Sequence, residues 1–471
     1  MSRRVALTLS CLGCLVASRA AFAEGDGAPS AAVPEIEIHL LTMGPGDHLY
    51  TRSGHAALMV AEMQDGRPTN TKVYNFGDTD WERETFVSDF LRGRLIFFLS
   101  SPGDLTETVM LYGVEQSRDV YRQKLNLTSD QARQVARRLE VGLRPENREY
   151  LYHHLEAICT TKIRDLLDEV TGGALTAQLG PRTDAHTVRH YVDWAFSGWW
   201  GASLGSALLL GRMHDEPISE YYVLFQPRRM RELFQEVTLE LANGEHVPLA
   251  DPPTILAERQ GPQAITGPNR FPTVLAWIFL LVAGVGAFAV YGHLPGKSRP
   301  AGVWLLLWSI PSGLIGLVIA FLMAVSDVPE ARANELIVAF PPTDLFLVIP
   351  AYRWLRGRTY AGPLMRIYAG VRVSALVLIS IGRIAGELYQ QPVIWFWVGL
   401  VCVFALWSMV RGMRVTMHHK GCKRGPQKST YLAYILGNLL VRLLGWRVDG
   451  RFPADVPKAV VIAAPHTSNW D

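Results

Sequence analysis

Cysteine is scarce in this chain of 471 residues, which contains five, and two of these lie in a segment that we expect to be removed. Residues 1–23 combine an early pair of arginines, an apolar stretch and a final Ala-Phe-Ala, which predicts a secretory signal peptide. Cys11 and Cys14 belong to that stretch. Cys159 is then the only cysteine within residues 24–260, so a disulfide framework is excluded there and the thiol becomes a candidate reactive group.

The sequence also lacks the features that mark nucleic-acid-binding and metal-binding proteins. Lysine and arginine total 46 against 43 aspartates and glutamates, and no stripe of basic and aromatic residues accompanies this small excess, so nucleic acid is not an expected partner. We find no metal motif, internal repeat or low-complexity tract, and we expect no cofactor. His153 and His154 are adjacent, so on a helix they would point apart and make a poor ligand pair.

Long apolar runs dominate residues 271–412, whereas residues 24–260 are mixed and polar. Because each span needs roughly 20 residues to cross about 30 Å of hydrocarbon, we expect about five transmembrane helices. The fourth run is weakened by Arg372 and Arg383, which would have to snorkel or face other helices. Counting it as a span keeps the basic loops on the inner side throughout. The five runs are residues 271–294, 301–325, 336–352, 367–388 and 392–410.

Five spans predict a multi-pass membrane protein with its N-terminal domain on the outer side and its C-terminus on the inner side. The third run contains Asp344, and an acid at such a position is often functional. However, Pro341 and Pro342 suggest a broken or re-entrant segment, so a structural role fits equally well. Residues 244–270 are rich in proline and glycine and predict a linker into the membrane.

The exported region places its predicted strands early and its helices late, which is typical of an α+β domain and not of a doubly wound sheet. Apolar and charged residues alternate in the first strand, so we expect it to be half-buried. Thr128 and Gln131 have the spacing of a capping box at the start of a helix over residues 129–142. The expected strands are residues 35–42, 55–61, 71–76, 95–99 and 119–127.

Cys159 opens a predicted helix, because Ile163, Leu167 and Val170 follow it at helical spacing. A thiol at a helix N-terminus faces unpaired N–H groups and the positive end of the dipole, so we expect the thiolate to be favoured. His55 begins a predicted strand, which would hold its imidazole on a rigid element. A cysteine and a histidine placed in this way suit acyl transfer through a thioester. The alternative is a buried core cysteine and an unrelated histidine.

Eight sequence blocks follow one another over roughly residues 36–350: GHAAL, YNFG, DFLRGRLIFFLS, LNLTSDQ, RPENREYLY, CTTKIRDLL, DEPISEYYVLFQP and SDVPEARANELIVAFPPTDL. This ordered series resembles the bacterial lipoprotein intramolecular transacylases (Lnb). The resemblance implies a papain-like, circularly permuted cysteine fold followed by a helical membrane domain, with Cys159 as nucleophile and His55 as its base. Together with the five spans, it implies a protein of the bacterial inner membrane with its N-terminal domain in the periplasm and its C-terminus in the cytoplasm. The implied activity moves an acyl chain from the diacylglyceryl group of a lipoprotein to its N-terminal amine, so diacylglyceryl lipoproteins and membrane phospholipid are the implied partners.

The chain departs from that family immediately before the nucleophile. Similar proteins often have Asp-Asn where this chain has Ala157 and Ile158, which puts the efficiency of the reaction in question. Asn75 or Asp80, in or just after the YNFG block, could orient the imidazole. Turn or packing roles for Asn75 and Asp80 are equally compatible with the sequence.

Residues 429–471 carry a second resemblance, to the start of a glycerolipid acyltransferase of the lysophosphatidic acid acyltransferase type. His466 and Asp471 match its motif of histidine, four residues and aspartate. The resemblance implies an incomplete α/β domain, with His466 as a general base, Asp471 as its partner, and acyl-CoA or acyl carrier protein as donor. We expect that the given sequence is part of a longer fusion.

Three alternative functions remain compatible with these residues. A cysteine peptidase or amidase acting on peptidoglycan would share the fold and the Cys–His pair, but would not require so large a membrane portion. A glycerophospholipid acyltransferase would follow if the C-terminal part dominates. A non-catalytic membrane sensor would follow if the departure at Ala157 and Ile158 has removed activity.

Overall fold

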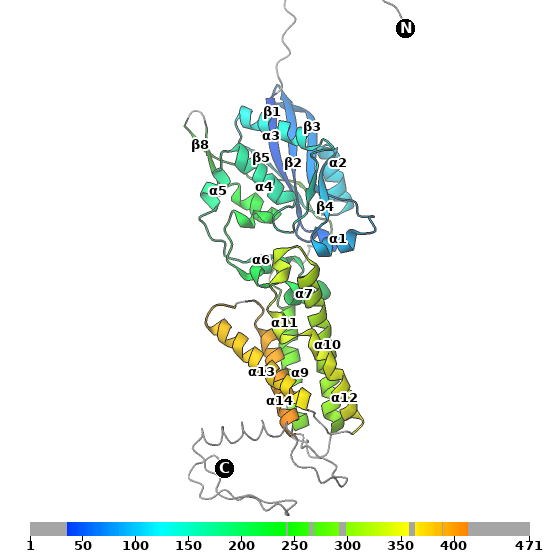
Figure 1. Cartoon of the computed structure of the whole chain (residues 1–471). Helices are drawn as coiled ribbons and strands as arrows, with labels where there is room; N and C mark the ends of the chain where they lie inside the picture. Colours follow the sequence, from blue (N-terminus) through cyan, green and yellow to red (C-terminus); the bar gives the residue numbers. More distant parts are fainter. Residues whose placement is uncertain are drawn as a thin grey trace, which may run out of the picture. The chain divides into compact units, whose positions relative to one another are not determined.

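The computed structural model describes residues 35–241, 244–262, 267, 269–291, 298–357, 363–388 and 390–412 (Figure 1). The predicted signal peptide, residues 1–23, lies outside the described residues. The acyltransferase-like segment 429–471, with His466 and Asp471, also lies outside them, so both remain predictions.

The N-terminal domain is built on a seven-stranded antiparallel sheet with the strand order β6-β4-β3-β2-β1-β5-β9. Each of the five predicted strands is present, and antiparallel pairing agrees with the expected α+β class. The strands are β1 (Glu35–Met43), β2 (His55–Gln64), β3 (Arg67–Asp78), β4 (Ile96–Gly103), β5 (Val120–Leu125), β6 (Glu149–Leu151) and β9 (Thr254–Ala257).

Strand β1 is buried on both faces from Ile38 to Met43, so the prediction of a half-buried strand was wrong. Its Ile38 and Leu40 pack in one core with α3 and α4 residues, while Leu41 and Met43 pack in a second core. That second core is closed by residues of α2 (Leu105–Val109) and of the π-helical turn η2 (Met110–Glu115). The sheet is therefore the middle layer of the domain.

Two helices of the first core follow the sequence prediction closely. Helix α3 (Ser129–Gly142) begins after Thr128, whose hydroxyl accepts from the Gln131 N–H (3.3 Å) while the Gln131 side chain accepts from the Thr128 N–H (2.9 Å). The predicted capping box is thus confirmed. Helix α4 (Cys159–Val170) buries Ile163 and Leu167 completely against the sheet.

Shorter elements complete the domain. Residues 244–270 are not a plain linker as predicted, because β8 lies within this stretch and β9 pairs with β5 at the sheet edge. The remaining elements are α1 (Phe86–Arg92), α5 (Ala174–Leu179), α6 (Val188–Ala195), α7 (Trp200–Leu209), α8 (Pro227–Leu233), η1 (Leu49–Thr51), η3 (Arg212–Asp215), η4 (Tyr222–Phe225), β7 (Thr238–Glu240) and β8 (His246–Pro248).

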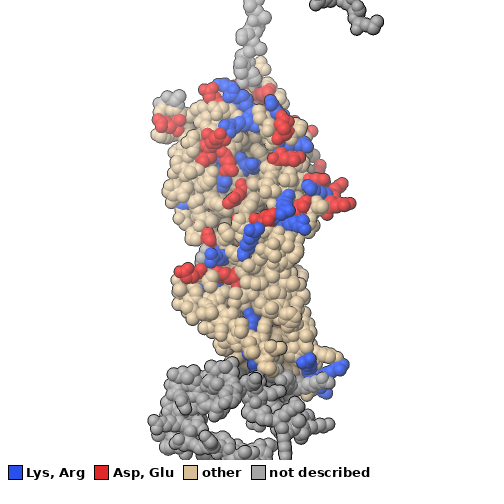
Figure 2. Space-filling model, in the orientation of Figure 1, with Lys and Arg blue, Asp and Glu red and all other residues tan. Residues whose placement is uncertain are grey.

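The C-terminal part of the described chain is helical. Three of its segments, residues 299–325, 329–355 and 363–384, are long and apolar enough to cross a membrane, and α9 and α14 contribute shorter apolar stretches. On the face shown in Figure 2, charged side chains gather over the N-terminal domain and are sparse over the helical region. The elements are α9 (Phe271–Tyr291), α10 (Ser298–Val325), η5 (Pro329–Arg332), α11 (Leu336–Ala339), η6 (Pro342–Leu347), α12 (Val348–Leu355), α13 (Pro363–Ile384) and α14 (Ile394–Gly412).

The third apolar run is broken at Pro341 and Pro342, as predicted. The break provides polar partners for the charged side chains of Asp344 and Arg372. Arg372 donates to the carbonyl oxygens of Val338 and Ala339 at the end of α11, where the helix leaves them without helical partners. The same guanidinium lies 3.3 Å from Asp344, which also accepts from Tyr368 (2.6 Å). Arg372 therefore faces other helices, and a structural role for Asp344 is favoured.

Candidate active site

Cys159 is the first residue of α4, and the local sequence leaves the helix N-terminus open around its sulfur. Ile158 occupies the N-cap position and has no side-chain acceptor, so no cap blocks the first turn. Thr161 instead folds back, and its hydroxyl accepts from the Ile158 N–H at 2.9 Å. The backbone N–H groups of Cys159, Thr160 and Ala56 each act to lower the pKa of the Cys159 thiol.

His55 lies at the start of β2, directly before Ala56, whose backbone acts on the pKa of the Cys159 thiol. The thiol and the imidazole therefore belong to the same corner of the domain, where α4 meets the beginning of β2. The His55 Nε2 atom lies 3.2 Å from Asn75 Oδ1 on β3. With this oxygen as acceptor, Nε2 carries the proton and Nδ1 keeps the lone pair that a general base needs. The imidazole also stacks on Tyr112, with ring centroids 5.6 Å apart.

Asn75, and not Asp80, is the partner of the imidazole. Asp80 is exposed, and its carboxylate accepts from the Glu82 N–H at 3.2 Å. Of the two residues that were predicted as possible partners of His55, only Asn75 lies beside it. Gly77 follows in the same block with a φ of +105°, and a Cβ built there would lie 3.9 Å from the Cβ of Cys159. Glycine thus allows β3 to bend directly beside Cys159.

Burial decides the protonation states of the pair. It lowers the pKa of the His55 imidazole to about 4; the charge of Arg118 acts in the same direction, and the hydrogen bond to Asn75 opposes both. Burial raises the pKa of the Cys159 thiol, against the effects of the three N–H groups and of Arg118. The backbone at the start of α4 does act to lower the pKa of the thiol, as predicted. The prediction that the thiolate is favoured was wrong, because burial raises that pKa by more. The resting pair at neutral pH is a thiol and a neutral imidazole, each partly open to solvent.

Arg118 is a site residue that the sequence did not reveal. Its side chain is only 1% exposed, and its charge acts on both His55 and Cys159. Its hydrogen-bond acceptors are uncharged, namely the Gly44 carbonyl (2.8 Å) and the Gln116 side chain (3.1 Å). Among the described residues its Nη2 atom has no hydrogen-bond partner. Burial lowers the pKa of the guanidinium to about 10, which still leaves it charged at pH 7.

We expect that Arg118→Met will slow the alkylation of Cys159 by iodoacetamide. The Arg118 charge lowers the pKa of the thiol, so its removal raises that pKa and reduces the thiolate fraction. Nearby opposite charges commonly change a pKa by one or more, which corresponds to about a tenfold lower rate near pH 7. The alkylated Cys159 peptide would be followed by mass spectrometry between pH 6 and 10. Arg118→Lys keeps the charge and should change the rate less; identical profiles for both variants and wild type would contradict the role.

Ala157 and Ile158, where similar proteins often have polar residues, serve the backbone and the core. Ala157 and His153 exchange two backbone hydrogen bonds of 3.0 and 3.3 Å, and Ile158 packs against the first core.

The backbone bridge between His153 and Ala157 closes a tight turn. The prediction that His153 and His154 lie on a helix was therefore wrong. The two rings stack at 4.9 Å, and His154 contacts His214 (3.3 Å). Among the described residues, no cluster of three or more His, Cys, Asp or Glu could hold a metal ion.

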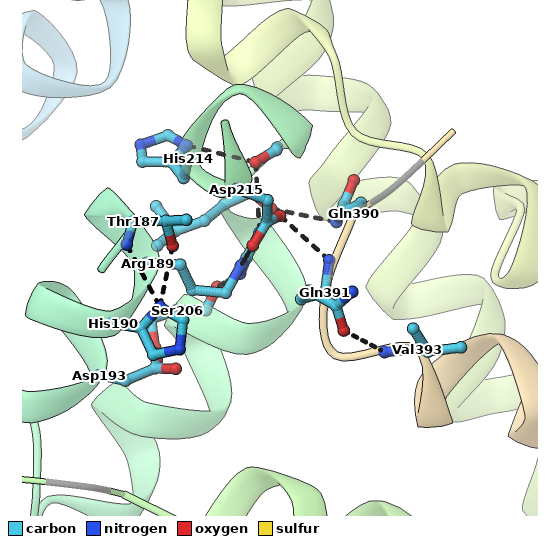
Figure 3. Close-up of polar contacts among 12 residues, drawn as sticks. Thr187, Arg189, His190, Asp193, Ser206, His214, Asp215, Gln390, Gln391 and Val393 are labelled. Atoms are coloured by element: carbon cyan, nitrogen blue, oxygen red, sulfur yellow. Dashed lines mark hydrogen bonds and ion pairs between the residues drawn. The ribbon is translucent and has the colours of Figure 1, made fainter. Parts of the chain in front are cut away.

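A second polar cluster joins α6 and η3 to the segment before α14 (Figure 3). Arg189 forms two hydrogen bonds to the Asp215 carboxylate, of 2.6 and 2.9 Å, and both side chains are almost fully buried. The Gln391 N–H also donates to Asp215 (3.0 Å), and the side chains of Arg189 and Gln390 share the Leu210 carbonyl as acceptor. The charges of Arg189 and Asp215 compensate each other. This cluster therefore holds the segments together and is not a second reactive site.

Two models of known protein families match the chain. The chain matches the Lnb N-terminal periplasmic domain over residues 29–193 and the Lnb transmembrane domain over residues 268–411. The first match contains His55, Asn75 and Cys159, and the two together cover well over half of the chain. No curated protein and no solved structure matches. The chain therefore belongs to the Lnb family, as a membrane enzyme of lipoprotein modification with a periplasmic N-terminal domain.

Proposed function

We propose that this protein is a lipoprotein intramolecular transacylase that uses Cys159 as nucleophile and His55 as general base. The observation that carries the proposal is the position of β3 beside both residues. Its Asn75 lies 3.2 Å from His55 Nε2, and two residues later a Cβ on Gly77 would lie 3.9 Å from the Cβ of Cys159. Cysteine, histidine and asparagine in these roles recur in papain-like enzymes. The tautomer that Asn75 favours leaves His55 Nδ1 free to accept the thiol proton.

The first half-reaction forms a thioester. His55 takes the proton of Cys159 as the sulfur attacks an ester carbonyl of the diacylglyceryl group. The resulting oxyanion is stabilised by backbone N–H groups at the start of α4. The C–O bond then breaks, the glycerol oxygen receives the proton from His55, and the acyl chain remains on the sulfur.

The second half-reaction transfers the chain to nitrogen. The N-terminal amine of the same lipoprotein attacks the thioester carbonyl, and the C–S bond breaks as the amide forms. The proton that the amine loses returns the sulfur to its thiol form through His55. A neutral resting pair suits both steps, because the imidazole can accept a proton in each of them. The buried charge of Arg118 favours every state in which negative charge develops near the sulfur.

Attachment to the membrane raises the effective concentration of the substrates at the catalytic domain. Diacylglyceryl lipoproteins and phospholipids are held in the bilayer, so a catalytic domain joined to membrane helices meets them at a high effective concentration. We place the protein in the bacterial inner membrane, with the C-terminus in the cytoplasm. The motif of His466 and Asp471 would then serve a separate glycerolipid acyl transfer with a cytoplasmic acyl donor.

Mass spectrometry of lipoprotein N-termini from cells with and without this protein tests the proposal. With the protein, we expect an N-acylated N-terminal cysteine that carries one acyl chain fewer on its glyceryl group. Without it, the lipoproteins should keep a diacylglyceryl group and a free amine. An N-acylated product that retains both glyceryl chains would point to a phospholipid donor. Unchanged lipoproteins, together with altered peptidoglycan fragments, would favour the peptidase or amidase.

A further inference from the structure

Helix α1 leaves an apolar face exposed. Val87 and Phe90 are three residues apart and therefore lie on the same side of the helix. Val87 is 66% exposed and Phe90 is 49% exposed, which is unusual for apolar side chains so close together. Asp89 and Ser88 are instead used locally, through hydrogen bonds with Thr85 of 2.7 and 2.9 Å.

Exposed aromatic rings from two other segments extend this face. Tyr50 of η1 and Trp81, in the loop before α1, have ring centroids 4.7 Å apart, and Trp81 lies 5.2 Å from Phe86 of α1. Tyr50 is 65% exposed and Trp81 is 48% exposed. We refer to Tyr50, Trp81, Val87 and Phe90 as the α1 aromatic surface.

The α1 aromatic surface is fixed to the end of a helix that can span a membrane. Asp327 lies two residues beyond the end of α10, and its N–H donates to the Arg92 carbonyl at the end of α1 (2.9 Å). Its carboxylate also pairs with Arg94 (2.8 Å). A Cβ built on Gly93 would lie 2.5 Å from a methyl carbon of Val328, so the two segments are in close contact. The surface therefore lies where α10 leaves the apolar layer.

Trp199 and Trp200 provide a second group of the same kind at the end of α9. The Arg52 guanidinium, which follows η1, lies 5.9 Å from the Trp199 ring, and Trp200 is 71% exposed. In α7, Ser203 accepts a 2.6 Å hydrogen bond from Asn269, two residues before α9 begins. Tryptophan and tyrosine accumulate at the membrane–water interface because each combines an apolar ring with a polar group.

A row of rings leads from the α1 aromatic surface to the nucleophile. Phe90 lies 6.3 Å from Tyr152, and Tyr152 lies 4.5 Å from Phe97, both measured between ring centroids. A Cβ built on Gly77 would lie 3.9 Å from both Phe97 and the Cβ of Cys159. The rings thus lead from the exposed helix to the backbone of Gly77, which lies beside Cys159.

We propose that the α1 aromatic surface lies in the lipid interface of the outer leaflet, and that an acyl chain reaches Cys159 along Phe90, Tyr152 and Phe97. A bilayer lipid, and not a protein, is the occupant because the contacts with α10 and α9 hold the surface at the membrane boundary. The acyl path rests on the proposed transacylation, whereas the lipid contact does not.

Photo-crosslinking of the full chain in phosphatidylcholine–phosphatidylglycerol nanodiscs tests the lipid contact. Benzoylphenylalanine in place of Val87 should give a phospholipid adduct that is detected by mass spectrometry. The same substitution at Val141 of α3, an exposed valine of the same domain, is the matched control and should give none. Absence of an adduct at position 87, or equal adducts at both positions, would overturn the proposal.

Transacylation assays test the acyl path. Val87→Asp in the α1 aromatic surface should lower acylation of bilayer-held lipoprotein about tenfold, because a carboxylate in place of an apolar side chain opposes insertion of this surface into the apolar layer. Alkylation of Cys159 by iodoacetamide, which needs no bilayer, should stay at the wild-type rate. Unchanged transacylation would refute the path. If the wild-type protein shows no transacylation, the proposed function fails, while the crosslinking still decides the lipid contact.

Discussion

Replacing Cys159 with alanine is expected to abolish N-acylation of lipoprotein while the protein remains inserted in the membrane. The sulfur is the only group of the protein that bonds to the acyl chain in the proposed mechanism, and loss of such a nucleophile commonly costs about 10⁴-fold or more. Cys159→Ser should retain little activity, because a hydroxyl does not form its anion as readily as a thiol. Burial raises the pKa of the thiol already, so a weaker acid at this position would be still harder to activate.

The measurement is the mass of lipoprotein N-termini from cells that carry each variant as their sole copy. A thioester on Cys159, released by hydroxylamine, should be found in the wild-type protein and be missing from Cys159→Ala. Cys402 offers a matched control, since it is a buried cysteine of α14 in the helical region, far along the chain from the candidate site. Cys402→Ala should retain activity. Full activity in Cys159→Ala would exclude the thioester route.

Local elements of this fold were predictable because their signals lie within a few residues of each other. The capping pair Thr128 and Gln131 marked the start of α3, and the spacing of apolar residues after Cys159 marked α4. The break in the third apolar run was predictable because two adjacent prolines cannot continue a regular helix.

Features that depend on contacts between distant segments could not be predicted. Arg118 lies directly before a predicted strand and looks like a turn residue, but the pairing of β5 with β1 buries it beside the active-site corner. Asn75 and Asp80 were indistinguishable until the fold brought one of them within 3.2 Å of His55. The balance of the Cys159 pKa was missed for the same reason, since burial is a property of the whole fold whereas a helix end is local.

In the membrane region, too, local features could be predicted from the sequence, whereas contacts between distant segments could not. Basic residues in the loops justified counting the fourth run as a span, and residues 363–384 are long and apolar enough to cross a membrane. The partners of its arginines were not predictable. Arg372 reaches Asp344 in the broken third run and the end of α11, and Arg383 lies 3.2 Å from Glu335, the residue directly before that run.

Removing the imidazole with His55→Ala should lower thioester formation by about 10²- to 10⁴-fold, the usual contribution of a general base. The loss should not add to that of Cys159→Ala, because members of one catalytic unit fail together. Asn75→Ala should cost less, since the base remains but its tautomer and orientation are no longer held. Rates of thioester formation in a single turnover would rank the three variants, and wild-type rates in His55→Ala would exclude the base.

The pH dependence of the same reaction separates a neutral pair from an ion pair. With the pKa of His55 lowered to about 4, the imidazole is unprotonated at every pH well above that value. We therefore expect the rate to hold or rise from pH 5.5 to 8, because only the thiol still titrates in that direction, and to fall as the pH approaches about 4. Asn75 raises the pKa of His55, so Asn75→Ala should move this acid limb lower, while Asn75→Asp, by adding a negative charge, should move it higher. A limb near pH 6.5 in the wild-type protein, the ordinary pKa of histidine, would contradict the lowered pKa of His55. A rate that falls as the pH rises through 8 would show that the resting pair contains an imidazolium, and the neutral resting pair would be wrong.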